Sequence, residues 1–553
     1  MKRFAPRFKR WHIACISMAM LILVIRLLLN LGFASAPPSK TWGRHITLGI
    51  SQSAYSMALS ADDKGLFVVW PKDAGLEYAV ADTGGRLINT GSLPIATNKP
   101  LGMKASRSSE GTHLLWIDQL SNALFWTLLD SNGEILNGPA PLDAGVWSFS
   151  LTGNVLVYAK EDMLYAFELS AQGPKDRGIP LKLPQLRSYD ARLDASGNLH
   201  VVAVTIPEPR RPRLRYLHMD ARGIWQKEVD LYSQYVPSTS SLGPVSLGID
   251  TAMAYVFWNV ESVTGGDIGG SRSFTEVDSL LFPLSNPSDV VVRKLRLRTS
   301  PLTEYASYVA DASPRDGQQE YLDVAVSALV QDSMRKKSVE VVSLRFRQGE
   351  LISSDRVSRT RNASMKPVGT ESDGARFIAW YDVEGRGTYA VRLSSDNEVF
   401  RKHSAGLKSE YALTALINTF QDMIAAATLI FVALFWLTPA YFVIMAVTVF
   451  AIGYTERRPW TVFLLGAALS VAFKTGYLTR ALYKPGLIQI MPAWMSSVYT
   501  GILFCLLFSA VGGGIVYLYT KETHHRAAIP LFSVFALTDS AFTLLFFAGY
   551  MFI

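Results

Sequence analysis

Cysteine is scarce in this chain. Of 553 residues only Cys15 and Cys505 are cysteines, and both lie inside apolar stretches. The long region between them therefore cannot contain an internal disulfide and must fold by burying a hydrophobic core. Because the chain also exceeds the usual size of a single core, we expect at least two structural units.

Strong catalytic motifs are missing as well. The sequence has no Walker A loop, no Gly-x-Ser-x-Gly elbow, no His-Glu-x-x-His helix and no Cys-x-x-Cys pair. Three acidic residues near the ends of predicted strands, Asp118, Asp323 and Asp382, are the acid–base candidates if the chain is an enzyme. We favour a non-enzymatic protein and expect no cofactor and no metal.

The net charge of +8 has a simple partial explanation. A basic cluster, made of Lys2, Arg3, Arg7, Lys9 and Arg10, precedes the first apolar run. Basic residues at such a position hold the N-terminus in the cytoplasm. The positive charge therefore indicates orientation and solubility, and we do not expect nucleic acid as a partner.

The first apolar run, Ile13–Phe33, is interrupted by Arg26 and followed by Ala34-Ser35-Ala36-Pro37. The small-x-small pattern allows a cleaved signal peptide. However, cleavage after Ala36 would leave proline at the first mature position, and the run is long for a signal peptide. We favour an uncleaved signal anchor over residues 1–36, and either alternative places residue 40 onward outside the cytoplasm.

The C-terminal region, 415–553, contains four further apolar runs, at about 423–453, 460–479, 495–519 and 528–552. Each is near or above the roughly 20 residues that cross a bilayer as a helix. The first run is over-long and contains Pro439, so it is either one kinked helix or a tight hairpin. We predict a transmembrane domain of about four helices in a bacterial cell membrane, with the N-terminus cytoplasmic and residues 40–410 extracytoplasmic.

Three ionisable residues fall inside these apolar runs: Arg26, Lys474 and Asp539. Charged groups in hydrocarbon are costly unless they pair or face water. Lys474 and Asp539 are candidates to pair with each other, and Arg26 with an acidic residue of another span. A buried structural pair and a transport or partner-docking site are both compatible with this pattern.

The middle region repeats one motif, a polar or Gly-containing turn followed by an apolar strand that often ends in an aromatic residue. Seven copies occur, at 64–70, 110–118, 153–158, 196–204, 252–258, 321–326 and 373–380. Most copies continue into a second strand and an Asp/Asn/Gly turn, such as Asp130-Ser131-Asn132-Gly133. We therefore predict repeats of about 40 to 55 residues built from strands and turns.

This repeat resembles the blade of a β-propeller, and the resemblance covers about residues 45–405. It implies an all-β extracytoplasmic domain of about seven blades within residues 40–410. Five aromatic residues stand at equivalent positions of the repeat, namely Trp70, Trp116, Tyr158, Trp258 and Trp380. We expect this periodic set to pack between neighbouring blades rather than to bind a ligand.

The fifth repeat is lengthened by an insert around 262–273 that contains Gly265, Gly266, Asp267, Gly269 and Gly270. We interpret it as a flexible loop, and because long loops on rigid scaffolds often carry binding functions, as a possible contact site.

These observations favour a membrane-anchored propeller that binds an envelope protein or a glycan as a receptor, sensor or assembly scaffold, while the C-terminal helices contact other membrane proteins. One alternative is an accessory subunit of a transporter or channel, which Lys474 and Asp539 motivate. Another is a membrane-tethered glycan-active enzyme.

Overall fold

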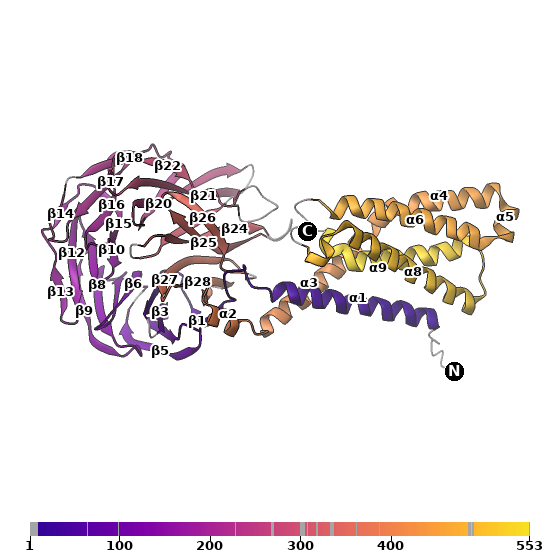
Figure 1. Ribbon diagram of the computed structural model, residues 1–553, viewed down its shortest axis with the longest axis horizontal. Coiled ribbons are helices and arrows are strands. Elements are labelled where there is room, and N and C mark those ends of the chain that lie inside the picture. Colours follow the sequence, from indigo (N-terminus) through magenta and orange to yellow (C-terminus); the bar gives the residue numbers. More distant parts are fainter. Residues whose placement is uncertain are drawn as a thin grey trace. The chain divides into compact units, whose positions relative to one another are not determined.

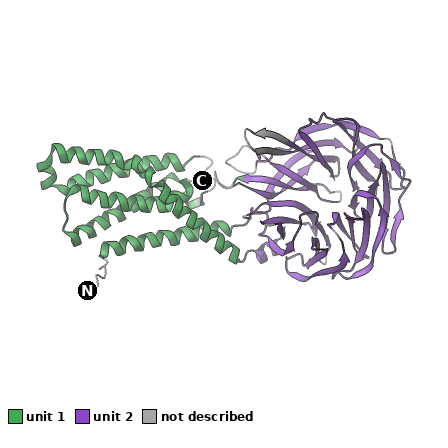
Figure 2. Ribbon diagram, turned by 180° about the vertical axis from the view of Figure 1, so that it is seen from behind, with its two compact units in different colours: residues 1–36, 331–337, 407–553 green, residues 37–330, 338–406 purple. Residues whose placement is uncertain are grey.

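The computed structural model describes residues 9–551 except 63–64, 98, 227, 267–269, 299–304, 307, 317–318, 332–336, 361, 386, 485–487 and 489–490. The chain divides into two compact units (Figure 2). Unit 1 contains residues 1–36, 331–337 and 407–553, and unit 2 contains residues 37–330 and 338–406. Each unit is described separately below.

Unit 2 is a seven-bladed β-propeller, since its strands form seven separate antiparallel sheets arranged around one axis (Figure 1). The first three blades are β2 (Ala58–Asp62), β3 (Gly65–Lys72), β4 (Gly75–Ala81) and β5 (Leu87–Ala96); β6 (Leu101–Ser108), β7 (Gly111–Asp118), β8 (Ala123–Leu129) and β9 (Ile135–Ala144); and β10 (Val146–Thr152), β11 (Val155–Lys160), β12 (Met163–Ser170) and β13 (Gly173–Asp176), with β14 (Leu181–Lys182) also pairing with β12.

Blades 4 to 6 follow in the same order along the chain. They are β15 (Leu186–Leu193), β16 (Leu199–Glu208), β17 (Arg211–Met219) and β18 (Val229–Ser233); β19 (Ser240–Ile249), β20 (Met253–Gly266), β21 (Gly270–Pro283) and β22 (Val291–Lys294); and β23 (Val309–Pro314), β24 (Leu322–Gln331), β25 (Lys337–Arg347) and β26 (Glu350–Arg356).

Blade 7 closes the ring with a strand from the other end of the unit. Its strands β27 (Ser364–Ser372), β28 (Ala375–Gly385) and β29 (Thr388–Ser395) are completed by β1 (Ile46–Ser51), which pairs antiparallel with β29. The innermost strands, β2, β6, β10, β15, β19, β23 and β27, contact one another in sequence, and β27 contacts β2. The ring of inner strands is therefore continuous.

The predicted fold class is confirmed. Each of the seven predicted repeats forms the second strand of one blade, from β3 to β28. The periodic aromatic side chains are buried, and each belongs to a hydrophobic cluster that includes residues of the preceding blade. Trp258 of blade 5, for example, packs with Val202 and Leu214 of blade 4. Burial of these large rings holds neighbouring blades together.

Aspartate turns connect several strands as the sequence pattern indicates. Asp130 Oδ1 accepts hydrogen bonds from the backbone N–H groups of Asn132 and Glu134, both at 2.8 Å. Gly133 in this turn has φ +90°, a left-handed conformation that glycine adopts without strain. The same pair of hydrogen bonds recurs at Asp194 and Asp220.

The insert of the fifth repeat was wrongly predicted to be a loop. Strands β20 and β21 continue through it as a long hairpin, with Ser262 opposite Phe274 and Gly266 opposite Gly270. Unbroken antiparallel pairing satisfies the backbone hydrogen bonds of this segment, so it does not need to be irregular. Gly265, Gly266 and Gly270 lie in the two strands, whereas Asp267 and Gly269 lie outside the described residues.

Unit 1 consists of helices. They are α1 (Arg10–Ala34), α3 (Ser409–Thr428), η1 (Leu429–Ala433), α4 (Leu434–Phe450), α5 (Ile452–Arg457), α6 (Pro459–Leu482), η2 (Ala493–Met495), α8 (Val498–Thr523) and α9 (Ala528–Met551), while the short α2 (Glu398–Ser404) belongs to unit 2. Among the described residues, five helical segments are long and apolar enough to cross a membrane: 10–34, 409–450, 459–482, 498–523 and 528–551.

The first C-terminal segment is one interrupted helix rather than a hairpin. Helices α3, η1 and α4 follow one another without a connecting loop, and the 3₁₀ turn at Leu429–Ala433 marks the interruption. The helix begins at Ser409, earlier than the apolar run suggests. Pro439 lies inside α4, so the interruption precedes the proline that the sequence marked as the site of a kink.

Candidate functional site

The helical unit brings together two of the ionisable residues that the sequence identified. Lys474 on α6 and Asp539 on α9 are fully buried, and Lys474 Nζ lies 2.6 Å from Asp539 Oδ1. Lys474 Nζ also donates to Ser509 Oγ of α8 at 2.8 Å and to Thr543 Oγ1 at 3.3 Å. Among the described residues, Asp539 Oδ2 has no hydrogen-bond donor. Three helices thus meet at one polar site inside an apolar bundle.

Arg26 of α1 forms a second polar cluster in the same unit. Its guanidinium is buried and pairs with Asp422 of α3. Asn30, one turn further along α1, donates to Asp422 Oδ2 and to Thr419 Oγ1, both at 3.0 Å. The Arg26 guanidinium also lies 4.6 Å from the ring centre of Tyr550 on α9. The partner Asp422 was not predicted from the sequence, because it lies just before the apolar run that begins at about residue 423.

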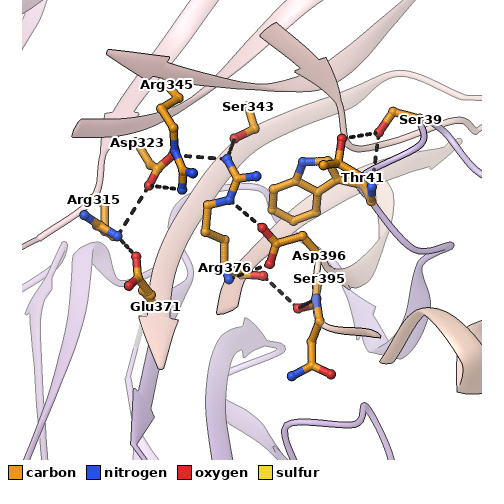
Figure 3. Close-up of polar contacts among 12 residues, drawn as sticks. Ser39, Thr41, Arg315, Asp323, Ser343, Arg345, Glu371, Arg376, Ser395 and Asp396 are labelled. Carbon is orange, nitrogen blue, oxygen red and sulfur yellow. Dashed lines mark hydrogen bonds and ion pairs between the residues drawn. The ribbon is translucent and has the colours of Figure 1, made fainter. Parts of the chain in front are cut away.

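In the propeller, Asp323 belongs to an arginine network that joins blades 6 and 7 (Figure 3). Arg345 holds its carboxylate with two hydrogen bonds of 2.9 and 3.1 Å, and Arg376 Nη1 donates to it at 3.1 Å. Although burial opposes ionisation, the hydrogen bond from Arg345 and the surrounding guanidinium groups keep the pKa of Asp323 below its usual value. Asp323 is therefore an ionised structural anchor.

The same network reaches the seam where the propeller closes. Arg376 Nε donates to Asp396 Oδ2 at 2.6 Å (Figure 3). Its guanidinium also lies 5.1 Å from the centre of the Trp42 ring. Nearby, the Gly43 N–H donates to the Ser395 carbonyl oxygen at 2.9 Å. These contacts tie the segment before β1 to the segment after β29. Their geometry fits a bracing function rather than acid–base catalysis.

The other two acidic candidates have different surroundings. Asp118 accepts hydrogen bonds from the Ser121 backbone N–H and hydroxyl at 3.0 and 2.9 Å, which caps a turn. Asp382 is buried and accepts hydrogen bonds from Ser364 Oγ at 2.7 Å and Trp380 Nε1 at 2.8 Å. Burial raises the pKa of Asp382 to about 7. Arg392 Nε also lies 3.2 Å from Asp382 Oδ2, so this buried carboxylate has a cationic partner as well.

Near the ring axis, polar side chains of blades 3 and 4 are hydrogen-bonded to each other and to backbone groups of blades 5 and 6. Asp190 of β15 accepts from Ser150 Oγ of blade 3 at 2.7 Å and from the Leu247 N–H of blade 5 at 2.8 Å. Arg192 donates to Asp190 at 3.0 Å and to the Pro314 carbonyl oxygen of blade 6 at 3.3 Å. These bonds lock the relative positions of blades 3 to 6.

A contact across the ring joins two blades that are not neighbours. Asp316, in the segment between β23 and β24, accepts from Thr152 Oγ1 at 2.6 Å and from the Gly153 N–H at 2.8 Å. Thr152 and Gly153 belong to blade 3, and Asp316 belongs to blade 6. The segment that follows β23 therefore reaches across the end of the ring at which the inner strands finish.

At the opposite end of the ring, where the inner strands begin, the strand register is repeatedly broken. The pairing of the inner strand with its neighbour shifts near the start of β6, β10, β15, β19, β23 and β27. All inner strands run in the same direction along the axis of the ring. The six irregularities therefore gather at the end where these strands begin, which we call the bulge end. Bulges re-aim side chains and are common beside functional sites.

Two non-glycine residues inside these bulges, Asp311 with φ +54° and Lys366 with φ +50°, adopt left-handed backbone conformations. Such conformations cost roughly 1 to 3 kcal/mol and persist where the surrounding structure enforces them. Here Asp311 Oδ2 accepts from the Lys366 N–H at 3.2 Å, which links blades 6 and 7.

Blades 3 and 4 place large side chains at their bulges, Trp147 in β10 and Arg187 in β15. Both are exposed. Sequence analysis missed them because bulges depend on strand register, although Trp147 could have been noticed as a tryptophan outside the periodic aromatic set.

Within the residues that the structure describes, no group of three or more His, Cys, Asp and Glu side chains could hold a metal ion.

No protein-family model matches the chain, and no curated protein is similar to it in sequence. Among solved structures, the WD40 domain of Toxoplasma gondii coronin has 11% identity and a TM-score of 0.38, and the alignment covers 64% of this chain and 84% of that chain. The polysaccharide lyase Uly1 has 10% identity and a TM-score of 0.38, and the alignment covers 61% of this chain and 88% of the lyase. The α-L-arabinanase of Penicillium chrysogenum, solved with arabinobiose, has 10% identity and a TM-score of 0.35, with coverage of 64% and 98%. These values are too low to carry an argument about function, and the fold assignment rests on the strand pairing of this chain.

Proposed function

We propose that this protein is a membrane-anchored β-propeller that binds a ligand from the cell envelope at its bulge end, as a receptor or assembly scaffold. Five apolar helical segments provide the anchor. The observation that carries the proposal is the recurrence of bulges in the inner strands of six blades at one end of the ring. A rigid scaffold that presents side chains from many blades around one axis suits recognition.

The hydrogen-bonded network near the axis supports this proposal. Asp190, Arg192 and Asp316 fix blades 3 to 6 relative to one another, so the residues at the bulge end are held on an ordered support. A preorganised surface loses little conformational entropy when it binds a ligand.

Site-specific photo-cross-linking of the full-length protein in its host membrane tests the proposal. A photoreactive residue replaces Arg187 at the bulge end, and in a matched variant it replaces the exposed Arg86, in the turn before β5 at the other end of the ring. We expect a discrete adduct from position 187 and none from position 86. Equal labelling at both positions, or no adduct at 187, would contradict the proposal.

A second candidate function, an accessory subunit of a transporter or channel, is favoured by the polar site at Lys474 and Asp539. A carboxylate oxygen without a donor inside an apolar bundle is costly, and such residues often mark ion or proton pathways. This function predicts that neutral substitution of either residue abolishes flux in reconstituted vesicles without lowering the amount of folded protein.

A further inference from the structure

Two helix termini meet at one end of the helical unit. Helix α1 begins at Arg10 and helix α8 ends at Thr523, and both termini lie at the same end of this unit (Figure 1). The backbone N–H of Arg10 donates to Glu522 Oε1 at 2.9 Å. This hydrogen bond joins the start of α1 to the last turn of α8. We call this place the basic helix end, for the cations described below.

The ring of Tyr519 on α8 holds the neighbouring segments together. Trp11 of α1 packs edge-on against this ring, with 5.5 Å between ring centres. His525, in the connection between α8 and α9, stacks on the same ring, with 6.4 Å between ring centres. Arg10 precedes Trp11 and Arg526 follows His525 in the chain. The contacts of Tyr519 therefore bring two cationic residues from distant parts of the sequence to one place.

The backbone at the end of α8 explains why the chain turns back here. His524 adopts a left-handed conformation with φ +58°, and its N–H donates to the Thr520 carbonyl oxygen at 3.0 Å. A left-handed residue at this position ends a helix and redirects the chain. The residues after His524 consequently stay beside the last turn of α8 instead of continuing along its axis.

The charge at the basic helix end is mostly positive. Lys9, Arg10, Lys521 and Arg526 are all exposed. Within the described residues, none of the four forms an ion pair, because Glu522 accepts its hydrogen bond from the backbone of Arg10 and not from a cationic side chain. Such a group of uncompensated cations attracts an anion.

Exposed apolar side chains lead away from these cations along both helices. On α1, the exposed Ile13 and Ile16 follow Arg10 at intervals of three residues, so the three share one face. On α8, Tyr517 is 61% exposed and lies one turn before Lys521 on the same face. An apolar face that ends in cations matches a ligand with an anionic head and hydrocarbon chains.

We propose that the basic helix end binds an anionic phospholipid, with its phosphate held by Arg10, Lys521 and Arg526 and its chains along the exposed faces of α1 and α8. Arginine binds phosphate through parallel hydrogen bonds, and lysine binds it as a point charge. A zwitterionic lipid brings its own cation next to the phosphate, and the basic helix end repels that cation. This inference goes beyond the proposed function and rests only on its membrane anchor.

The test uses the full-length protein in detergent and native mass spectrometry, which resolves individual bound lipids. Phosphatidylglycerol and phosphatidylcholine are the two probes, since they share chains and phosphate but differ in net charge. We expect phosphatidylglycerol to bind at least about tenfold more tightly. Inorganic phosphate, added as a competitor at the same concentration, should not displace this lipid, because it has no chains to lie on the helices.

Three double variants locate the site. Lys521→Gln/Arg526→Gln should weaken binding of phosphatidylglycerol about tenfold, whereas Lys521→Arg/Arg526→Lys keeps both charges and should retain binding. The matched control is Arg457→Gln/Arg458→Gln, which removes two exposed cations from the connection between α5 and α6 and should bind the lipid like the wild type. The thermal unfolding midpoint of each variant in phosphatidylcholine nanodiscs checks that it remains folded.

Equal binding of the two lipids to the wild type, or displacement by inorganic phosphate, would overturn the inference. Equal weakening in the two Gln variants would also overturn it, because it would reveal a general attraction to a positive surface and not a site. Carbonate extraction of host membranes separates this failure from that of the proposed function. If the protein is extracted, the membrane anchor and both proposals fail. If it stays in the membrane while the lipids bind equally, only the lipid inference is wrong.

Discussion

Arg26 and Asp422 form an ion pair inside the helical unit although 396 positions separate them in the chain. The pair connects α1 to α3, and Ile22 of α1 is buried in a cluster with Leu478 and Phe546. The first helix is therefore an integral part of the bundle. Removal of α1 would leave the Asp422 carboxylate without its guanidinium partner in an apolar environment, where an uncompensated charge is strongly unfavourable.

We predict that residues 1–36 are retained in the mature protein. Intact-mass measurement of protein purified from its host membrane should give the mass of the chain with its N-terminal helix. A mass that corresponds to a chain beginning at Pro37 would show that the segment is a cleaved signal peptide, and would contradict the packing of α1.

The Arg26–Asp422 pair also predicts a pattern of stability. Arg26→Leu and Asp422→Leu should each destabilise the folded protein by about 3 kcal/mol, because each leaves one charge buried alone. The double variant Arg26→Leu/Asp422→Leu should recover much of that loss, since no unpaired charge remains. Thermal unfolding in nanodiscs measures the three variants. Additive losses in the double variant would mean that the pair does not interact.

The same comparison of single and double variants applies to Lys474 and Asp539, with the amount of folded protein as the measured quantity. If the pair is structural, Lys474→Met and Asp539→Asn should each lower the amount of folded protein, and Lys474→Met/Asp539→Leu should be less harmful than either. Size-exclusion chromatography after detergent extraction gives the folded fraction. Normal folded protein from both single variants would contradict the structural role and favour the transport function.

Much of the propeller could be predicted because its determinants are local. A blade repeats its turn, its apolar strand and its interblade aromatic residue within about 50 positions, so the seven second strands are visible in the sequence. The long hairpin at 262–273 was misjudged because glycines at 265, 266 and 270 suggest a loop, whereas pairing with the opposite strand decides the structure.

Features that depend on distant pairing could not be predicted in this way. The closing strand β1 pairs with β29, more than three hundred residues away, and nothing within 46–51 identifies that partner. The positions of Trp147 and Arg187 depend on bulges, which arise from the register between two strands and not from the composition of either. The acidic residues near strand ends attracted attention from sequence, but Asp323 is used for bracing and Asp118 for a turn.

Two tryptophans allow packing and recognition to be separated. Trp258→Ala removes a buried ring between blades 4 and 5 and should destabilise the propeller by about 3 to 5 kcal/mol. Trp147→Ala removes a partly exposed ring and should cost much less stability while affecting ligand binding. Denaturant unfolding followed by circular dichroism compares the two. Similar losses from both variants would mean that Trp147 is a packing residue.

Asp382 predicts a pH dependence with a defined sign. Burial raises the pKa of its carboxyl group in the folded protein to about 7, above the value of about 4 in the unfolded chain. Between these values the folded state binds a proton that the unfolded state has lost, so this group's stabilising contribution is complete below about pH 4 and is lost as pH rises to about 7. Asp382→Asn removes the titration and still offers an oxygen to Ser364 and Trp380. The free energy of unfolding of the wild type, relative to that of the variant, should therefore fall by roughly 4 kcal/mol over this range.

Asp220→Asn serves as a control of opposite sign, because hydrogen bonds from the Ile224 backbone and Arg222 lower the pKa of Asp220 and its contribution is lost as pH falls. A constant difference between wild type and Asp382→Asn from pH 4 to pH 8 would show that Asp382 is ionised throughout, held by Arg392, whose Nε lies 3.2 Å from Asp382 Oδ2.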